Sequence, residues 1–141
     1  MALENWLKIG KIVKHETSKE EISAIFGVVG RCLKDASLPG LSSDQKYILS
    51  YQAAFETALA LLYKNGYKPI KTGHHYTVWQ CLKEILVKEQ HKAILLFEAA
   101  AKKRSKLSYD IAGLASQQEA NEMYQEAVKF IELIKEKIKP S

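Results

Sequence analysis

A short run of charged and polar side chains near residue 104 has the residue types needed to bind phosphate. Its members are Lys102, Lys103, Arg104, Ser105, Lys106, Tyr109 and Asp110. The arginine guanidinium is planar, and its N–H donors match the oxygens of a phosphate group. The lysines add positive charge, so affinity for a polyanion would fall as the salt concentration rises. This run predicts a site for an anionic ligand, with nucleic acid as the leading candidate and a solvated lysine surface as the alternative.

Cleavage of RNA without a metal ion would need a proton-transfer group in addition to this charge. Such a group takes a proton from the ribose hydroxyl or gives one to the leaving oxygen, while a cation stabilises the charge on the phosphate. Arg104 could be the cation. Tyr109 is the candidate for the proton transfer, but an unperturbed phenol, with a pKa of about 10, stays protonated at neutral pH. We therefore expect binding rather than efficient catalysis, and cleavage by Arg104 and Tyr109 is the alternative.

The spacing of Arg104 and Tyr109 does not bring the two side chains together on a regular helix. Five residues place them about 140° apart around the helix and about 7.5 Å apart along its axis. They would converge only through long side chains, a loosened helix end or a partner subunit. A structural role is the other interpretation, in which Tyr109 caps the corner between two helices and Arg104 pairs with Asp110 or Glu98.

No metal or cofactor site is predicted. His74 and His75 are adjacent, and neighbouring residues of a helix point about 100° apart, so they are poorly placed to bind one ion. We expect them to pack or to cap the start of a helix, with His75 one turn before Trp79 and able to stack. Cys32 and Cys81 lie on apolar stripes, which is typical of buried free cysteines.

A stripe of aromatic residues repeats at helical spacing before this point in the chain. Such a stripe could stack bases, but it more often forms core or dimer surface. We expect Phe55 in the core and leave the tyrosines open. The stripe consists of Tyr47, Tyr51, Phe55 and Tyr63.

Apolar periodicity predicts six helices. Two of them begin with a serine followed three residues later by glutamate, the pattern of a capping box. Gly27 and Gly30 lie inside the second helix and suggest close helix packing or a bend. Residues 35–43, 67–73 and 111–115 are the expected links. The helices are expected over residues 2–13, 18–34, 44–66, 74–89, 91–109 and 116–138.

The composition is that of a globular protein rich in helix. The chain has 141 residues, of which 47% are hydrophobic and 26% charged, with a net charge of +5. No segment shows sustained strand alternation, so we expect an all-α fold: one domain over residues 1–141, with its core at about 18–138, built as an antiparallel up-and-down bundle of five to six helices. Neither a signal peptide nor an apolar run of about 18 residues is visible, which predicts a cytoplasmic protein without a membrane segment.

With these helices placed, the sequence resembles the HEPN family of small helical bundles. Residues 102–110 followed by the capped helix 116–138 are similar to the family's arginine motif, short link and terminal amphipathic helix. Residues 43–69 followed by His74 and His75 are similar to the middle of a bacterial and archaeal branch. The resemblance covers about residues 18–138. In the family's motif, arginine and a polar residue are followed by histidine; Arg104 and Ser105 match, but Tyr109 occupies the histidine position.

This resemblance implies a homodimer that is non-catalytic or weakly active. Many HEPN proteins are metal-independent ribonucleases with two motifs meeting at a dimer interface, whereas others are inactive partners of nucleotidyltransferases in toxin–antitoxin pairs, or bind RNA. The residues from Arg104 to Asp110 are then expected to bind RNA or a nucleotidyltransferase-type partner. An active ribonuclease and a purely structural interaction bundle are the alternatives.

Overall fold

The computed structural model describes residues 2–71, 74–109 and 112–139, and for residues 106–109 it describes the backbone only. The described part is mostly helical, as expected, with a small sheet of two strands. Its elements are α1 (Leu3–Lys8), β1 (Ile12–Lys14), α2 (Lys19–Ala36), α3 (Ser43–Lys64), β2 (Tyr67–Pro69), α4 (His75–Ile85), the 3₁₀ turn η1 (Lys88–Gln90), α5 (His91–Tyr109) and α6 (Gln117–Ile138).

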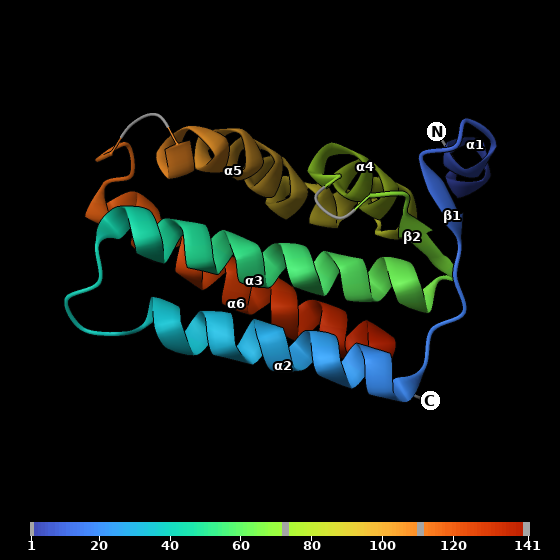
Figure 1. Ribbon diagram of the computed structural model, residues 1–141, viewed down its shortest axis with the longest axis horizontal. Helices are drawn as coiled ribbons and strands as arrows, with labels where there is room; N and C mark the ends of the chain where they lie inside the picture. The colour runs from blue at the N-terminus through green and yellow to red at the C-terminus, as the bar shows by residue number, and fades with distance from the viewer. Residues whose placement is uncertain (1, 72–73, 110–111, 140–141) are drawn as a thin grey trace.

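Helix α3 is the central element of the bundle. It packs against α2, α6, α4 and α5, while α1 and the sheet lie at one end (Figure 1). The chain direction alternates from α2 to α3, α5 and α6, which confirms the up-and-down bundle. Small residues in the middle of α3 let its neighbours approach closely, because an alanine adds little bulk to a helix surface. Those that are fully buried are Ala53, Ala54, Ala58 and Ala60.

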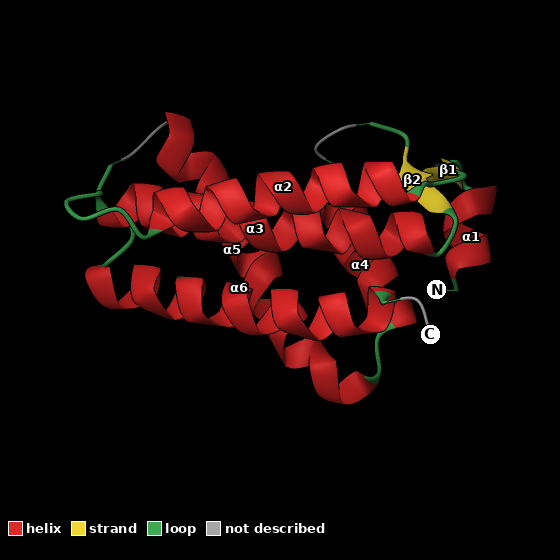
Figure 2. Ribbon diagram, turned by 90° about the horizontal axis from the view of Figure 1, so that it is seen from below, coloured by secondary structure: helices red, strands yellow, loops and turns green. Residues whose placement is uncertain are grey.

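The sheet corrects two predicted boundaries. Strands β1 and β2 pair antiparallel with Ile12 opposite Pro69 and Lys14 opposite Tyr67, at the end of the bundle visible in Figure 2. The predicted opening helix therefore ends at Lys8, and the predicted link after α3 contains a strand. Three residues are too few for an alternating pattern to be recognised, which is why periodicity did not find them. The fourth helix also ends earlier than predicted, at Ile85, before the separate turn η1.

The predicted caps are present, one of them in full. At the start of α6, Ser116 Oγ accepts from the Glu119 amide, and the Glu119 carboxylate accepts from the Ser116 amide. At the start of α2, Ser18 Oγ accepts from the Glu21 amide. The Glu21 carboxylate does not return to Ser18; it accepts from the Thr17 hydroxyl at 2.6 Å. The capping box at the start of α2 therefore has only one of its two hydrogen bonds.

The close packing suggested for Gly27 and Gly30 is wrong. Both residues are exposed on α2, and a Cβ atom built at either position would meet no other atom within 4 Å. Other predictions for the core are confirmed: Cys32 and Cys81 are free and buried, and Phe55 is buried. Within the described ranges, no helix has the length and apolarity needed to cross a membrane.

The exposed glycines of α2 provide a test of this helix. Replacing Gly27 or Gly30 with alanine should raise the free energy of unfolding by about 0.4 to 1 kcal/mol each, because the unfolded chain loses freedom and no clash arises. Urea denaturation followed by circular dichroism measures the change. Gly66→Ala is the matched control: φ at Gly66 is 93°, in the left-handed region, so this variant should lose about 1 to 2 kcal/mol. Destabilisation by both α2 substitutions would contradict the open environment.

Candidate functional site

Arg104 lies on the inward face of α5. Phe97 and Ala100 precede it by seven and four residues on this helix, and both are fully buried. Residues at these spacings share one face of a helix, so the arginine side chain starts out toward the bundle. Arg104 is partly buried, and its Nε atom is buried without a hydrogen-bond partner among the described residues. This N–H therefore has unused hydrogen-bonding capacity within the described part of the chain, and an acceptor would reach it only after a covering group moves aside.

A hydrogen-bonded chain of three side chains joins α3 to α4 beside Arg104. Trp79 Nε1 donates to the Tyr51 hydroxyl at 3.0 Å, and the Tyr51 hydroxyl lies 2.6 Å from His75 Nδ1. Tyr51 and Trp79 are fully buried, whereas His75 is partly buried. The spacing of His75 and Trp79 on α4 is one helical turn, so both side chains face α3.

Ring stacking fixes the positions of these three hydrogen-bonded side chains. The His75 ring stacks on Phe55 with a centroid separation of 3.8 Å and an interplanar angle of 17°. Trp79 stacks on Phe97 of α5 at 5.2 Å, which connects the α3–α4 chain to the helix that carries Arg104. The prediction that His75 packs is confirmed, with Phe55 and Tyr51 as its partners. The capping role is not observed for His74, whose side chain makes no cap hydrogen bond.

The positive charge of Arg104 affects the pKa values of Tyr51 and His75, the two titratable groups of this hydrogen-bonded trio. Burial, and secondly the positive charge of Arg104, lower the pKa of His75 from 6.5 to about 4. Burial raises the pKa of Tyr51, against the opposing effects of the Trp79 hydrogen bond and of Arg104. Both side chains are therefore uncharged near neutral pH, and Arg104 is the cation beside them.

Lys103 does not share the position of Arg104. Its Nζ atom pairs with the Glu119 carboxylate at 2.6 Å and lies 5.3 Å from the centre of the Tyr47 ring. This hydrogen bond, and secondly the one from the Ser116 amide, lower the pKa of Glu119 to about 2. The pair fastens the end of α5 to the start of α6.

The remaining predicted site residues fall into two groups. Lys102 and Ser105 are exposed on α5. The side chains of Lys106 and Tyr109, and the whole of Asp110, lie outside the described residues, so the pairing of Arg104 with Tyr109 or Asp110 stays a prediction. Glu98, the other acid suggested as a partner for Arg104, pairs with Lys83 at 2.6 Å and accepts from Gln80.

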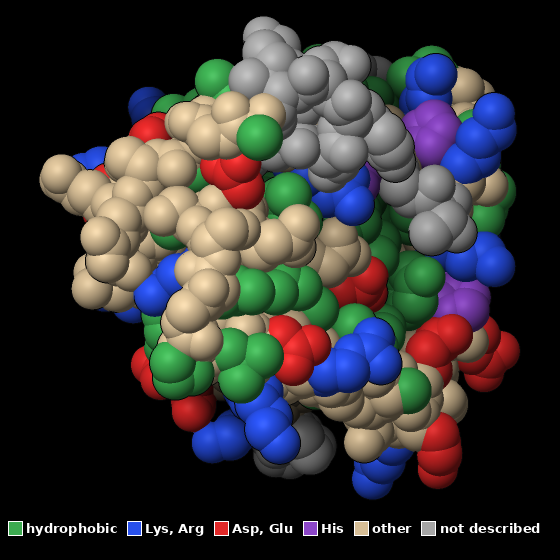
Figure 3. Space-filling view, turned by 60° about the vertical axis from the view of Figure 1, so that its left-hand side comes forward, with side chains coloured by type: hydrophobic (Ala, Val, Ile, Leu, Met, Phe, Trp, Pro, Cys, Tyr) green, Lys and Arg blue, Asp and Glu red, His purple; other side chains and the backbone are tan. Residues whose placement is uncertain are grey.

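The surface at this end of the bundle is mixed in charge. In Figure 3, acidic and basic side chains are intermixed among the described residues of the face shown, and no broad patch of one sign is visible. Binding of an anion here therefore depends on particular donors more than on a broad positive surface. In the described residues, no group of three histidine, cysteine, aspartate or glutamate side chains could hold a metal ion.

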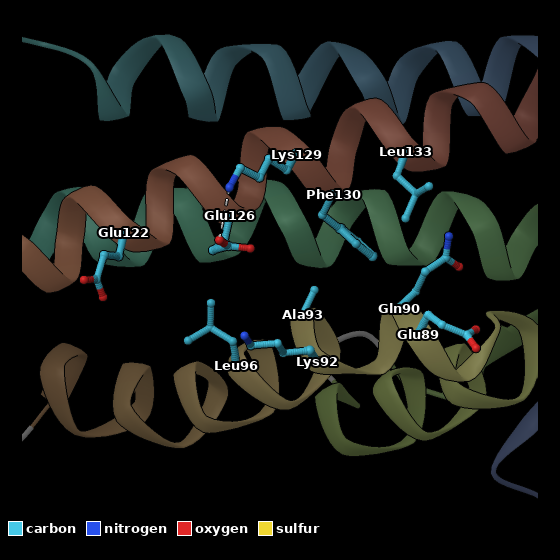
Figure 4. A pocket seen from close by; sticks show the side chains of 10 residues that line it. All are labelled: Glu89, Gln90, Lys92, Ala93, Leu96, Glu122, Glu126, Lys129, Phe130 and Leu133. Atoms are coloured by element: carbon cyan, nitrogen blue, oxygen red, sulfur yellow. Dashed lines mark ion pairs between the residues drawn. The ribbon is translucent and has the colours of Figure 1, made fainter.

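A separate groove runs between α5 and α6. It has a volume of about 460 Å³ and an apolar floor that includes Leu96, Phe130 and Leu133. Figure 4 shows side chains of both helices directed into this space, with the Lys129–Glu126 ion pair at its side. Arg104 and His75 do not line the groove. The groove is therefore distinct from the Arg104 site, by which we mean Arg104 together with Tyr51, His75 and Trp79.

Sequence reasoning missed that His75 belongs with Arg104. A signal was present in the matching spacing of two ring pairs, Tyr51 with Phe55 and His75 with Trp79, each one turn apart. This spacing shows that each pair shares a helix face, but it does not show that the two faces meet or that α5 brings Arg104 to them.

The lowered pKa of His75 predicts an acid-sensitive contribution to stability. Between pH 6.5 and about 4 the unfolded chain binds a proton at this residue and the folded chain does not. The stability contributed by neutral His75 is therefore complete above pH 6.5 and is lost as the pH falls toward 4. Nitrogen-detected NMR should show the His75 ring titrating near the lower value, and Arg104→Ala should raise its pKa. An ordinary pKa in the folded wild-type protein would contradict the predicted effect of burial.

Comparison with known proteins agrees with this architecture. Residues 41–135, more than half of the chain, match the model of a HEPN-like domain family. The match includes α3 to α5 and most of α6, the helices that carry Arg104 and the side chains around it, whereas α2 lies outside it. No curated protein and no solved structure matches the chain. The family match confirms the resemblance to HEPN proteins over residues 41–135, and the chain therefore belongs to the HEPN family.

Proposed function

We propose that this HEPN protein binds RNA through Arg104 and the neighbouring lysines, with little or no cleavage. The observation that carries the proposal is the buried Arg104 Nε atom, which has no hydrogen-bond partner among the described residues. An unpaired buried N–H costs free energy, and an acceptor that reaches it recovers this cost. A phosphate oxygen is suited to the position, because it brings both an acceptor and a negative charge.

The neighbouring basic residues support binding to different degrees. Lys102 is exposed and can contact a second phosphate along a nucleic-acid backbone. Lys103 is already paired with Glu119, so it would have to leave that carboxylate before contributing. Arg104 is therefore the main contact, with Lys102 as the described residue that extends it.

The chemistry around Arg104 favours binding over cleavage. The nearby imidazole of His75 is neutral, and its Nδ1 atom is already engaged by the Tyr51 hydroxyl. An efficient base needs an available lone pair at hydrogen-bond distance from the ribose hydroxyl. The alternative is a metal-independent ribonuclease in which Tyr109 supplies the proton transfer with Arg104.

Fluorescence anisotropy with a labelled single-stranded RNA tests the binding. Arg104→Ala should weaken affinity by roughly tenfold or more, because hydrogen bonds to a charged group contribute about 1.5 to 3 kcal/mol. Lys92→Ala is the matched control, since Lys92 is an exposed basic residue of the same helix that lines the α5–α6 groove. The slope of affinity against salt should also decrease in Arg104→Ala. Equal affinity in the two variants would refute the assignment.

Incubating the same RNA with the protein in EDTA separates binding from cleavage. We expect intact RNA. Cleavage that persists in EDTA and disappears in Arg104→Ala would instead support the ribonuclease, and Tyr109→Phe would then show whether the phenol takes part.

A protein-binding role is the second candidate, and the α5–α6 groove favours it. Leu96, which is part of its apolar floor, is 37% exposed, and the next residue of α5 along the chain on its N-terminal side, Leu95, is 59% exposed. Apolar residues gathered on one surface are typical of protein contacts. A second copy of this chain is the proposed occupant, and a nucleotidyltransferase partner of the toxin–antitoxin kind is the other.

Light scattering after size exclusion tests the dimer. The wild-type protein should have the mass of a dimer, and Leu96→Asp should shift it to a monomer, because a carboxylate would lose its hydration in the contact. Leu38→Asp is the control, since Leu38 is also exposed but lies in the link between α2 and α3. A monomeric wild-type protein would exclude this occupant.

A further inference from the structure

The hydrogen-bonded chain beside Arg104 determines which nitrogen of His75 carries the proton. The indole Nε1–H of Trp79 can only donate, so the Tyr51 oxygen accepts this bond. The Tyr51 hydroxyl hydrogen then needs an acceptor of its own, because Tyr51 is fully buried. Among the described residues, the acceptor within reach is His75 Nδ1 at 2.6 Å. Nδ1 must therefore be unprotonated, and the hydrogen of the neutral ring is on Nε2.

The Nε2 edge of His75 is left available. Nε2 makes no hydrogen bond to the described residues, and His75 is only partly buried. Stacking on Phe55 fixes the plane of the ring. An N–H donor of fixed direction thus lies at the edge of the cluster that also contains Arg104.

We propose that His75 Nε2–H is a second hydrogen-bond donor for the phosphate held by Arg104, and that Trp79 and Tyr51 act as positioning residues which fix this tautomer. The inference rests on the proposed function and extends it by defining the group that is bound. That group is a phosphate with one oxygen contacted by the Arg104 guanidinium and a second oxygen contacted by the neutral His75 Nε2–H. It also assigns a role in recognition to a histidine that lies outside the arginine motif.

Two consequences distinguish a neutral donor from a charged one. An imidazolium that held phosphate would strengthen binding as the pH falls through the ordinary histidine range, whereas a neutral ring gives no such increase. A ring with hydrogen on Nε2 also cannot accept a proton there. The described groups that bear on the charge of His75 are the Tyr51 phenol of α3 and the Arg104 guanidinium of α5.

The tautomer is tested without any ligand. In nitrogen-detected NMR at neutral pH, His75 Nδ1 should have the shift of an unprotonated nitrogen and Nε2 that of an N–H. Tyr51→Phe removes the hydroxyl and should give a mixture of both forms, with circular dichroism used to confirm that the variant is folded. A hydrogen on Nδ1 in the wild-type protein would overturn the proposal.

RNA affinity then tests the donor. His75→Ala should weaken binding by roughly threefold to tenfold, the loss expected for one neutral hydrogen bond. His75→Gln should recover part of this loss, because its side-chain amide can donate from a similar position. The wild-type affinity should not increase as the pH is lowered from about 8 to about 6. Inorganic phosphate, in a second arm, should shift the His75 Nε2 signal if a free phosphate is sufficient, and RNA alone should do so if the polymer is required.

The outcomes separate the two proposals. If Arg104→Ala binds RNA as well as the wild type, RNA binding at this site is wrong. If Arg104→Ala is weakened while His75→Ala binds normally, RNA binding at Arg104 stands and the second donor is wrong. A wild-type affinity that increases as histidine becomes protonated would also refute the neutral donor.

Discussion

The hydrogen bond from Tyr51 to His75 is the constraint on which the Arg104 site depends. Tyr51 is buried in the central helix, so its hydroxyl must be satisfied inside the protein, and Trp79 and His75 of α4 do this from one helix face. Trp79 in turn stacks on Phe97 of α5. One polar group in the core therefore sets how α4 lies on α3 and where α5 carries its arginine.

This arrangement has an unusual balance between polar and apolar contacts. The tyrosine, histidine and tryptophan satisfy each other without a net charge, so they can be buried at small electrostatic cost. Arg104, the described cation whose charge acts on them, is only partly buried, and part of its hydrogen-bonding capacity is unused by the described residues. The interior of the bundle thus supports a charged group at its boundary without neutralising it.

Much of the fold follows from local sequence signals. The boundaries of α5 agree with prediction, as does the start of α6, where Ser116 and Glu119 form a reciprocal cap that depends on four consecutive residues. The strands were missed because each contains three residues. The proximity of His75 to Arg104 was missed for another reason. It depends on how α3, α4 and α5 pack against one another, and the pattern of residues along a single helix does not indicate this. Likewise, Lys103 was grouped with its neighbours in sequence although its ion pair is with Glu119, beyond the next link.

The Glu119 carboxylate makes two contacts that together affect how rigidly α5 and α6 are joined. It caps the first turn of α6 through the Ser116 amide, and it also holds Lys103 at the end of α5. A polyanion that draws Lys103 toward itself must compete with this acid. Binding of the polyanion would then weaken the contact between α5 and α6. The backbone at this junction would become less rigid as a result of a change in ion pairing.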